Sequence, residues 1–391
     1  MNMLRIGVIG VGGIGSAHVS CLLSGRIESA CLTAICDINE SRLAYYKDKN
    51  PDISGFYDYK ELAKSGLVDA VIVSVPHRLH AEIASYCLEH GLHVLVEKPE
   101  DISVTKAKEL NEVANRCSKV FAIMFNQRTN PLFIKAKEIV SSGGLGALKR
   151  TSWTVTNWYR TQCYYDSGDW RATWSGEGGG VLLNQAPHNL DLWQWICGLP
   201  CEITAICDEA KYHDIEVEDD VTIVARFSNG ATGTFITSTG ELPGTNRLEI
   251  CGDLGKIVIE DSKLKWWRLR ESERKTCFEA ESGFVEADFE YEEITSSDGG
   301  SAHAGIIQNF TNAILHGEEL ISNGCEGINE LMISNAAYLS QWSGNSKITL
   351  PIDNELFDKL LAEKAKLSEA VKKGEEPPLR TQYSERWQVK F

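Results

Sequence analysis

A glycine-rich segment near the start of the chain constrains the fold more than any other feature. The sequence GVGGIG (10–15) directly follows the short apolar run LRIGVI (4–9) and precedes a helix-like segment over 16–24. In a strand–turn–helix unit of this kind, Gly10 permits the tight turn, the second glycine lets the backbone approach a pyrophosphate, and the third lets the helix pack closely. The free N–H groups that open the helix then face the phosphates. This context predicts a dinucleotide site.

Strand-like and helix-like segments alternate through the first third of the chain. Continuous apolar runs separated by helical segments of about 10 to 15 residues indicate a parallel sheet that is buried on both faces. Further strands are expected over 31–36, 69–75, 93–99 and 120–125, and helices over 39–48, 79–90 and 103–117. Right-handed crossovers between such strands produce a doubly wound sheet. We therefore predict an α/β Rossmann domain over residues 1–125.

An aspartate marks the end of the second expected strand. Asp37 lies about 20 residues beyond the glycine motif, where a carboxylate accepts hydrogen bonds from the adenosine ribose and repels a 2′-phosphate. No basic residue follows among Ile38, Asn39 and Glu40. The position of Asp37 therefore predicts NAD as the cofactor in preference to NADP.

The rest of the chain has a different pattern. Strand candidates, including 221–227, 231–239, 246–252, 255–260 and 263–270, are divided by glycine or Asn-Gly turns, which indicates an open, largely antiparallel sheet. Helices are expected over 303–316, 326–342 and 354–371. We predict an α+β domain over 126–371 that binds substrate and mediates oligomerisation, followed by an extended arm over 372–391. The alternation of apolar and acidic residues over 285–292 predicts a half-buried strand.

The composition excludes several classes of partner. The 391 residues include 39 Lys plus Arg against 55 Asp plus Glu, a formal net charge of −16. Nucleic acids and anionic membranes favour excess positive charge, so neither is expected as the main partner. No apolar run approaches the roughly 18 residues that span a bilayer, and the N-terminus predicts no export signal. Twelve scattered cysteines without zinc-site spacing predict reduced thiols in the cytoplasm and no metal.

The tripeptide Glu97-Lys98-Pro99 ends an expected parallel strand. Open α/β sheets bind their ligands at the carboxyl ends of such strands. A lysine that is partly desolvated there has a lowered pKa and can exchange protons. Alternatively, Glu97 holds Lys98 charged in an ion pair. An isolated EKP tripeptide is most often a surface turn, so this signal depends on its context.

A second segment with chemical groups is GEGGGVLLNQAPHNLDLWQW (176–195). Asn184 and His188 are spaced i, i+4, and His188 and Asp191 are spaced i, i+3, so on a helix both pairs share one face. An imidazole beside an amide can hold a hydroxyl and transfer its proton. The alternative is a buried histidine with a purely structural role, and Pro187 weakens the helical spacing.

Together these motifs resemble the Gfo/Idh/MocA oxidoreductase family. The resemblance rests on GVGGIG with downstream His18, Asp37, SVPHRLHAEIA (74–84), EKP (97–99), NQR (126–128) and GGGVLLNQAPHNLD (178–191), and it covers roughly residues 3–350. It implies a Rossmann domain, a second domain with an open sheet, and a nicotinamide cofactor that lies across the sheet edge.

The resemblance also implies roles for individual residues. At the cofactor it places Gly10, Gly12, Gly13, Ile14 and Gly15 at the dinucleotide, Asp37 at the ribose, Ser74, Val75, Pro76 and His80 at the middle, and Glu97, Lys98 and Asn126 at the nicotinamide end. At the reacting carbon it places Lys98 and His188 as the acid/base pair. Many members have Asp where this chain has Asn184, and an amide cannot act as a base, so we assign Asn184 to orienting the substrate hydroxyl. We assign further substrate contacts to Asn126, Arg128, Trp158, Trp170 and Arg171.

Aromatic residues indicate the class of substrate. Tryptophans and tyrosines are frequent over 153–174 and recur at Trp193 and Trp195; about half of them are expected to be core, and the others can stack on sugar rings or flat aglycones. The stretch 169–195 also resembles family members that act on anhydro sugars and glycosides. We therefore expect oxidation of a secondary ring hydroxyl, at C3, of a cyclic sugar, glycoside or polyol.

Two other functions stay open on the sequence. One is a redox-neutral sugar enzyme, a glycoside hydrolase or epimerase that oxidises its substrate transiently and retains NAD. The other is a non-catalytic sensor that binds NAD, against which the presence of both Lys98 and His188 argues. An open sheet with one uncovered face also predicts a homo-oligomer.

Overall fold

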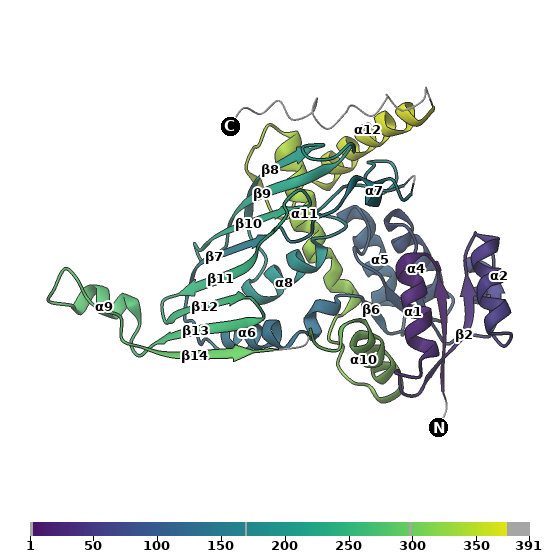
Figure 1. Ribbon diagram of the computed structural model, residues 1–391, viewed down its shortest axis with the longest axis horizontal. Coiled ribbons are helices and arrows are strands. Elements are labelled where there is room, and N and C mark those ends of the chain that lie inside the picture. The colour runs from purple at the N-terminus through teal and green to yellow at the C-terminus, as the bar shows by residue number, and fades with distance from the viewer. Residues whose placement is uncertain (1–2, 169, 297–298, 374–391) are drawn as a thin grey trace.

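The computed structural model describes residues 3–168, 170–296 and 299–373, so the predicted C-terminal arm lies almost wholly outside the described residues. Two sheets organise the chain, a parallel one built from the first third and a mostly antiparallel one built from the middle (Figure 1). The predicted fold class, a doubly wound Rossmann sheet combined with an open, largely antiparallel sheet, is confirmed.

The first sheet has six strands in the order β3-β2-β1-β4-β5-β6, and every neighbouring pair is parallel. Its strands are β1 (Leu4–Ile9), β2 (Ala30–Cys36), β3 (Ser54–Phe56), β4 (Ala70–Val73), β5 (His93–Val96) and β6 (Phe121–Ile123). The connecting helices are α1 (Gly13–Leu23), α2 (Glu40–Lys49), α3 (Tyr59–Lys64), α4 (His80–Glu89) and α5 (Val104–Arg116). The sequence patterns did not predict β3 and α3.

The order of this sheet fixes where a ligand can bind. The chain leaves β1 toward β2 on one side and returns to β4 on the other, so the two crossovers diverge at the carboxyl ends of β1 and β4. Doubly wound sheets bind ligands in the crevice at this switch point. All four residues of β4 are buried, as expected for a strand with helices on both faces.

The second sheet has nine strands in the order β14-β13-β12-β11-β7-β10-β9-β8-β15. All neighbouring pairs are antiparallel except β10 and β7. The strands are β7 (Leu148–Val155), β8 (Glu202–Glu209), β9 (Glu218–Arg226), β10 (Thr232–Ser238), β11 (Asn246–Gly252), β12 (Gly255–Glu260), β13 (Lys263–Leu269), β14 (Phe289–Thr295) and β15 (Ile348–Thr349).

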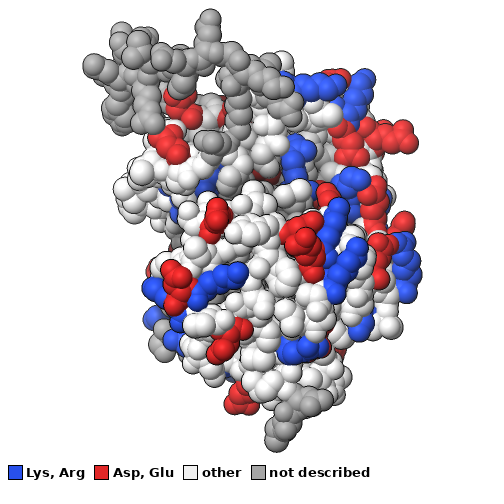
Figure 2. All heavy atoms as spheres, turned by 90° about the vertical axis from the view of Figure 1, so that its right-hand side faces the viewer, with Lys and Arg blue, Asp and Glu red and all other residues white. Residues whose placement is uncertain are grey.

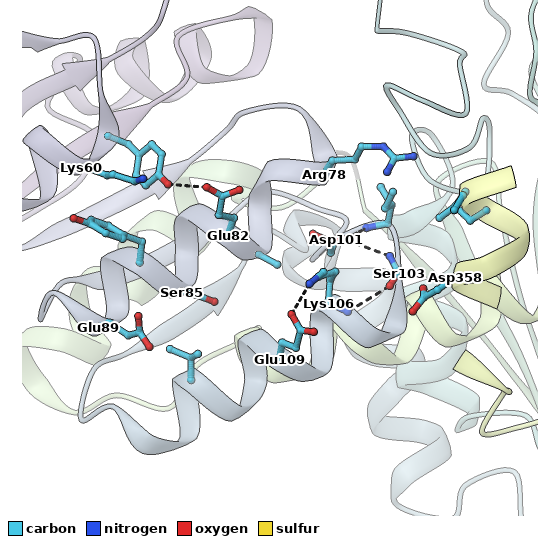
Figure 3. A pocket seen from close by; sticks show the side chains of 17 residues that line it. Lys60, Arg78, Glu82, Ser85, Glu89, Asp101, Ser103, Lys106, Glu109 and Asp358 are labelled. Atoms are coloured by element: carbon cyan, nitrogen blue, oxygen red, sulfur yellow. Dashed lines mark hydrogen bonds and ion pairs between the residues drawn. The ribbon is translucent and has the colours of Figure 1, made fainter. Parts of the chain in front are cut away.

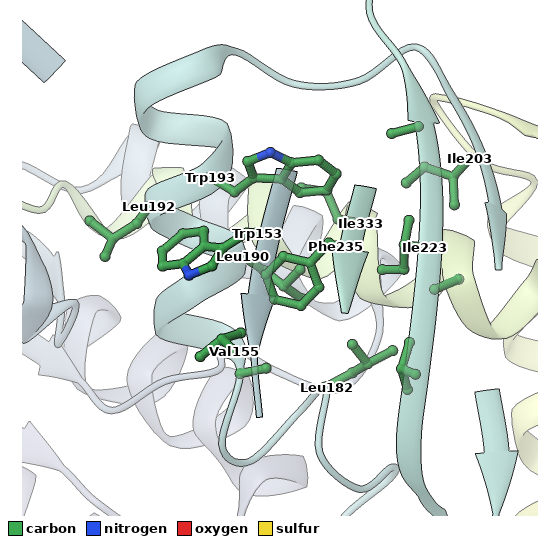
Figure 4. Packing of buried hydrophobic residues seen from close by; sticks show 14 of the residues in the cluster. Trp153, Val155, Leu182, Leu190, Leu192, Trp193, Ile203, Ile223, Phe235 and Ile333 are labelled. Carbon is green, nitrogen blue, oxygen red and sulfur yellow. The ribbon is translucent and has the colours of Figure 1, made fainter. Parts of the chain in front are cut away.

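Helices cover one face of this sheet. The helices of this part are α6 (Pro131–Ser141), α7 (Gln162–Tyr165), α8 (Pro187–Cys197), α9 (Glu273–Glu279), α11 (Gly327–Trp342) and α12 (Asn354–Lys373). The rings of Trp193 on α8 and Phe235 on β10 stack with centroids 5.5 Å apart, beside the buried Trp153 (Figure 4). Trp193 Nε1 donates to Thr151 Oγ1 at 3.1 Å, so the buried indole N–H is satisfied.

The opposite face of the second sheet is open. Along β8 and β9, buried residues alternate with accessible ones, and Ile206 and Val224 on the outer face are each 52% exposed. The edge strand β14 is more exposed still. The expectation of a half-buried strand over 285–292 is wrong, because the strand begins at Phe289 and pairs only with β13, and six of its seven residues are exposed.

The chain returns to the first sheet after β14. Ile306, Ile307 and Phe310 on α10 (Ala302–His316) pack into the same core as residues of β1 and β2. Charged groups of both signs are interspersed on the side of the molecule shown in Figure 2. Within the described residues, no helix combines the length and apolar character needed to cross a bilayer, and no cluster of three or more His, Cys, Asp or Glu side chains could hold a metal.

Candidate functional site

A cavity of about 920 Å³ opens at the carboxyl edge of the first sheet and extends to residues of the second domain. Every residue predicted to bind cofactor or substrate lines it, except Gly15 and Arg128. The predicted lining residues are Gly10, Gly12, Gly13, Ile14, Asp37, Ser74, Val75, Pro76, His80, Glu97, Lys98, Asn126, Trp158, Trp170, Arg171, Asn184 and His188. The fold therefore brings residues more than 170 positions apart in the sequence to one site.

The glycine loop has the geometry that its sequence predicts. Gly10 has a φ of +85°, and a Cβ there would lie 2.5 Å from the Ser74 carbonyl oxygen. A Cβ on Gly15 would lie 1.8 Å from the Gly10 carbonyl oxygen, so Gly15 serves close packing rather than lining the cavity. A Cβ on Gly12 would meet only Arg42 Nη1, at 3.7 Å, so this position is not crowded by the protein. Among the residues that the structure describes, no side chain caps α1, so its first N–H groups are available to a phosphate.

Asp37 is held rigidly beside this loop. Its Oδ2 accepts from Val11 N and its Oδ1 from Asn39 N, both at 2.8 Å. Arg42 on α2 also approaches, with Nη1 3.3 Å from Asp37 Oδ2, and it lines the cavity. The sequence argument considered only residues 38–40 and missed this arginine, which the first turn of α2 brings back to the aspartate. The site fits a dinucleotide with a carboxylate at the adenosine ribose.

Lys98 follows the end of β5 and is linked to the second domain. Its Nζ donates to the Asn184 backbone oxygen at 2.7 Å. Burial lowers the pKa of Lys98, while the charges of Glu97, Glu177 and Glu330 act in the opposite direction. A lysine in this setting can lose and regain a proton, which is the property that acid/base chemistry requires.

Glu97 is part of a buried pair and not a free base. Its Oε1 accepts from His18 Nε2 at 2.7 Å. Burial would raise the pKa of Glu97, but the hydrogen bond and charge of His18 lower it to about 2. On the other side of this pair, His303 of α10 lies against His18 with ring centroids 5.6 Å apart, and Asn126 Nδ2 lies 3.2 Å from His303 Nδ1. His303 lines the cavity and was missed, because nothing in the sequence indicates that α10 returns to the first sheet.

His188 is the second residue of α8 and lines the cavity. Burial, together with the charge of Lys98, lowers its pKa to about 3, so the imidazole is neutral near pH 7. Its Nδ1 is buried and has no hydrogen-bond partner among the described residues. A neutral, unpaired imidazole at the cavity wall is suited to hydrogen-bonding a substrate hydroxyl.

Asn184 does not share a helix face with His188. The helix begins at Pro187, and Asn184 lies in the turns that precede it. The two residues still meet at the cavity, but through the loop rather than through helical spacing. Proline at the first position of a helix is favourable because its missing N–H would be unpaired anyway, which explains why the helix starts here.

Glu177 is a site residue that the sequence argument missed. It is 1% exposed, its Oε2 accepts from Ala172 N at 2.6 Å, and its Oε1 accepts a short hydrogen bond from Asn184 Nδ2. Burial raises its pKa to about 7, although the Ala172 N–H and the charge of Arg171 act in the opposite direction. The signal that could have identified it is a single carboxylate inside an otherwise uncharged glycine run.

The structure does not bring Arg128 to the cavity, and its predicted role as a substrate contact is corrected. The guanidinium is 1% exposed and forms a bidentate pair with Asp191 of α8, with Nε–Oδ2 and Nη2–Oδ1 distances of 2.8 and 2.6 Å. It also pairs with Glu326. Arg128 therefore braces the segment after β6 against α8 and does not line the cavity.

Aromatic and guanidinium groups form the far wall of the cavity. The Arg171 guanidinium carbon lies 4.7 Å from the ring centroids of both Trp170 and Tyr164, and Arg171 Nη1 donates to the Tyr164 hydroxyl at 2.9 Å. Trp158 Nε1 donates to Asn189 Oδ1 at 3.1 Å. Such a wall offers flat faces and donors at the end of the cavity that a substrate would occupy. By contrast, Trp153, Trp174 and Trp193 are buried in the core.

A second hollow, of about 760 Å³, lies between α4, α5 and α12 (Figure 3). Two pairs of its polar side chains are hydrogen-bonded to each other: Lys106 Nζ to Glu109 Oε2 at 2.7 Å, and the Tyr59 hydroxyl to Glu82 Oε1 at 2.9 Å. None of the residues predicted for cofactor or substrate lines it. We therefore assign the chemistry to the cavity at the sheet edge.

Comparison with known proteins matches both parts of the chain to one family. Residues 4–125 match the model of an oxidoreductase family with an NAD-binding Rossmann fold, and residues 133–258 match the GFO/IDH/MocA C-terminal domain. Myo-inositol 2-dehydrogenase of Thermotoga maritima is 29% identical over 267 residues, covering 66% of this chain and 75% of that protein.

Solved structures share the fold. The WlbA dehydrogenase of Bordetella pertussis, in complex with NADH and UDP-GlcNAcA, superposes with a TM-score of 0.76 at 24% identity over 90% of this chain and all of that one. A levoglucosan dehydrogenase in complex with NADH and levoglucosan gives a TM-score of 0.73 at 21% identity, over 89% of this chain and 99% of that one. The two family models match successive parts of the sequence, so this chain belongs to the Gfo/Idh/MocA family of oxidoreductases and carries its NAD-binding Rossmann domain.

Proposed function

We propose that this chain is an NAD-dependent dehydrogenase that oxidises a secondary ring hydroxyl, at C3, of a cyclic sugar, glycoside or polyol to the ketone. The observation that carries the proposal is the convergence of Lys98, His188 and Asn184 on a cavity whose other end is formed by the glycine loop and Asp37. The names of the inositol and levoglucosan relatives support a polyhydroxylated substrate.

The proton chemistry follows from the side chains. When bound, the nicotinamide supplies the hydride acceptor. Lys98 takes the hydroxyl proton, because its lowered pKa makes the neutral amine accessible and the nearby charges of Glu97 and Glu177 stabilise the ammonium that results. His188 is too weak a base to store a proton near pH 7 and instead hydrogen-bonds the reacting oxygen. Trp158, Trp170 and Arg171 pack against the rest of the substrate.

NAD is the proposed cofactor. The Asp37 carboxylate occupies the position that contacts the adenosine ribose in Rossmann domains, and it would repel a 2′-phosphate. Arg42 is already paired with Asp37 and does not by itself offer an unopposed phosphate site.

We further propose that the chain acts in the cytoplasm as a homo-oligomer. The open outer face of the second sheet, with Ile206 and Val224 half exposed, is the surface that a second copy would cover.

Deuterium transfer tests the proposed reaction. Methyl glucosides deuterated at C2, C3 or C4 are incubated with the protein and NAD, and the reduced cofactor is analysed by mass spectrometry. The proposal predicts deuterated NADH from the C3-labelled sugar alone. Deuterium in NADH that comes from the C2- or C4-labelled sugar would contradict oxidation at C3. Loss or exchange of deuterium within the sugar without net formation of NADH would indicate the redox-neutral reaction.

A further inference from the structure

Glu177 is the buried carboxylate that connects the substrate end of the cavity to the loop behind it. Its two oxygens accept from the Asn184 side chain and from the Ala172 backbone, and its own backbone oxygen lies 3.3 Å from His77 Nδ1. Glu177 itself does not line the cavity, whereas Asn184 does. Any effect of Glu177 on a substrate therefore passes through a neighbouring group.

The carboxylate determines which way the Asn184 amide faces. Above its pKa of about 7, the Glu177 carboxylate only accepts hydrogen bonds, so the NH₂ group of Asn184 is the part that faces it. Among the described residues, none donates to Asn184 Oδ1. The amide oxygen is thus the free acceptor at the cavity wall, which suits a hydroxyl donor beside the reacting carbon. If Glu177 were neutral, the amide could flip and present its NH₂ group instead.

Glu177 also acts on Lys98 through its charge. Its carboxylate is one of three that oppose the effect of burial on the Lys98 amine. The charged and titratable groups around Lys98 are Glu97, Glu177, Glu330, Arg171, His77, His80, His188 and His303. Glu97 is engaged with His18. The Asn184 side chain donates to Glu177, and the Asn184 backbone oxygen accepts from Lys98 Nζ, so Asn184 connects the carboxylate to the lysine.

We propose that Glu177 is a positioning residue of the proton-transfer site, which fixes the Asn184 amide as a hydroxyl acceptor and stabilises the ammonium form of Lys98. The inference rests on the proposed function for its catalytic consequence, but its effect on Lys98 is independent of any substrate. It assigns to Asn184 the recognition of a substrate hydroxyl group through its amide oxygen.

The titration of Lys98 tests the proposal without turnover. The cofactor-free protein is acetylated with acetic anhydride over a series of pH values, and the labelling rate of the Lys98 amine is followed by mass spectrometry of its peptide. Glu177→Gln removes the negative charge, so the midpoint of the curve of Lys98 labelling rate against pH should fall by about one pH unit. In active protein, the acid limb of kcat/KM should move to lower pH in the same variant.

Glu218→Gln is the matched control. Glu218, the first residue of β9, is also a fully buried carboxylate that accepts from the same loop, from Gly180 N and Leu182 N at about 3.0 Å, but it is not among the groups around Lys98. Glu218→Gln should therefore leave the midpoint of the Lys98 labelling curve unchanged. An unchanged midpoint in Glu177→Gln, or an equal shift in both variants, overturns the proposal. If Glu177→Gln does not fold, Glu177→Asp retains the charge and should keep the parent midpoint; a midpoint lowered by a full unit would contradict the account.

Discussion

At the scale of single residues, Lys98 bears most of the proposed chemistry. Lys98→Met keeps the length of the side chain and removes the amine, so kcat should fall at least about 100-fold by the usual magnitude of acid/base catalysis. NADH binding, followed by fluorescence, should stay near that of the parent chain. Lys106→Met, which replaces an exposed lysine paired with Glu109, is the control and should retain full activity. Near-normal turnover of Lys98→Met would exclude Lys98 as the base.

Cofactor choice is also decided by one residue. Replacing Asp37 with Ser removes the carboxylate that opposes a 2′-phosphate. It also frees Arg42, whose Nη1 lies 3.3 Å from Asp37 Oδ2 in the parent chain. We therefore expect kcat/KM with NADP to rise at least about tenfold relative to NAD, since an arginine near this position accommodates the phosphate. Asp37→Ser/Arg42→Ala should lose most of that gain. A parent chain that already prefers NADP would contradict the assignment of Asp37.

Residues could be predicted from the sequence where the local chain geometry dictates the residue type. The strand before the glycine loop and the helix after it determine where the loop lies, and the end of β5 determines where Lys98 lies. Prediction from the sequence was incomplete where a turn or loop brings two segments together. Arg42 of α2 lies beside Asp37, and Glu177 accepts from Asn184 across the glycine-rich loop. The hydrophobic periodicity of a sequence contains no information about such contacts.

At the scale of elements, the Arg128–Asp191 pair holds the segment after β6 against α8. Both side chains are 1% exposed, so Arg128→Met would leave a buried carboxylate unpaired and should cost about 3 to 5 kcal/mol in the free energy of unfolding. Arg116→Met breaks an exposed pair with Glu89 and should cost at most about 1 kcal/mol. Urea denaturation measures both. Equal losses in the two variants would show that the buried pair is not a brace.

Strands with long apolar runs could be predicted from the sequence, and strands without such runs could not. The strands β1, β2, β4, β5 and β6 are apolar runs that are mostly buried, whereas β3 has only three half-buried residues and no such run. The alternating pattern over 285–292 resembles an amphipathic strand, but alternation cannot reveal that β14 is an edge strand and largely exposed. The start of α8 at Pro187 likewise depends on the loop before it.

At the scale of the whole molecule, the outer face of the second sheet is expected to be an interface. Light scattering coupled to gel filtration should give a mass that is a multiple of 43.4 kDa. Ile206→Glu/Val224→Glu places two charges on that face and should shift the protein toward the monomer. Leu23→Glu, on α1 of the other domain, should not change the mass. A monomeric parent chain would contradict this part of the account.

The central claim is that the cavity oxidises a ring hydroxyl with net transfer of a hydride. The most direct measurement is the absorbance of NADH when the purified protein is mixed with NAD and a panel of inositols, free sugars, anhydro sugars and glycosides, with products identified by mass spectrometry. The account predicts NADH in stoichiometric amount with a product that is two hydrogen atoms lighter. A sugar that is hydrolysed or epimerised without release of NADH would contradict it.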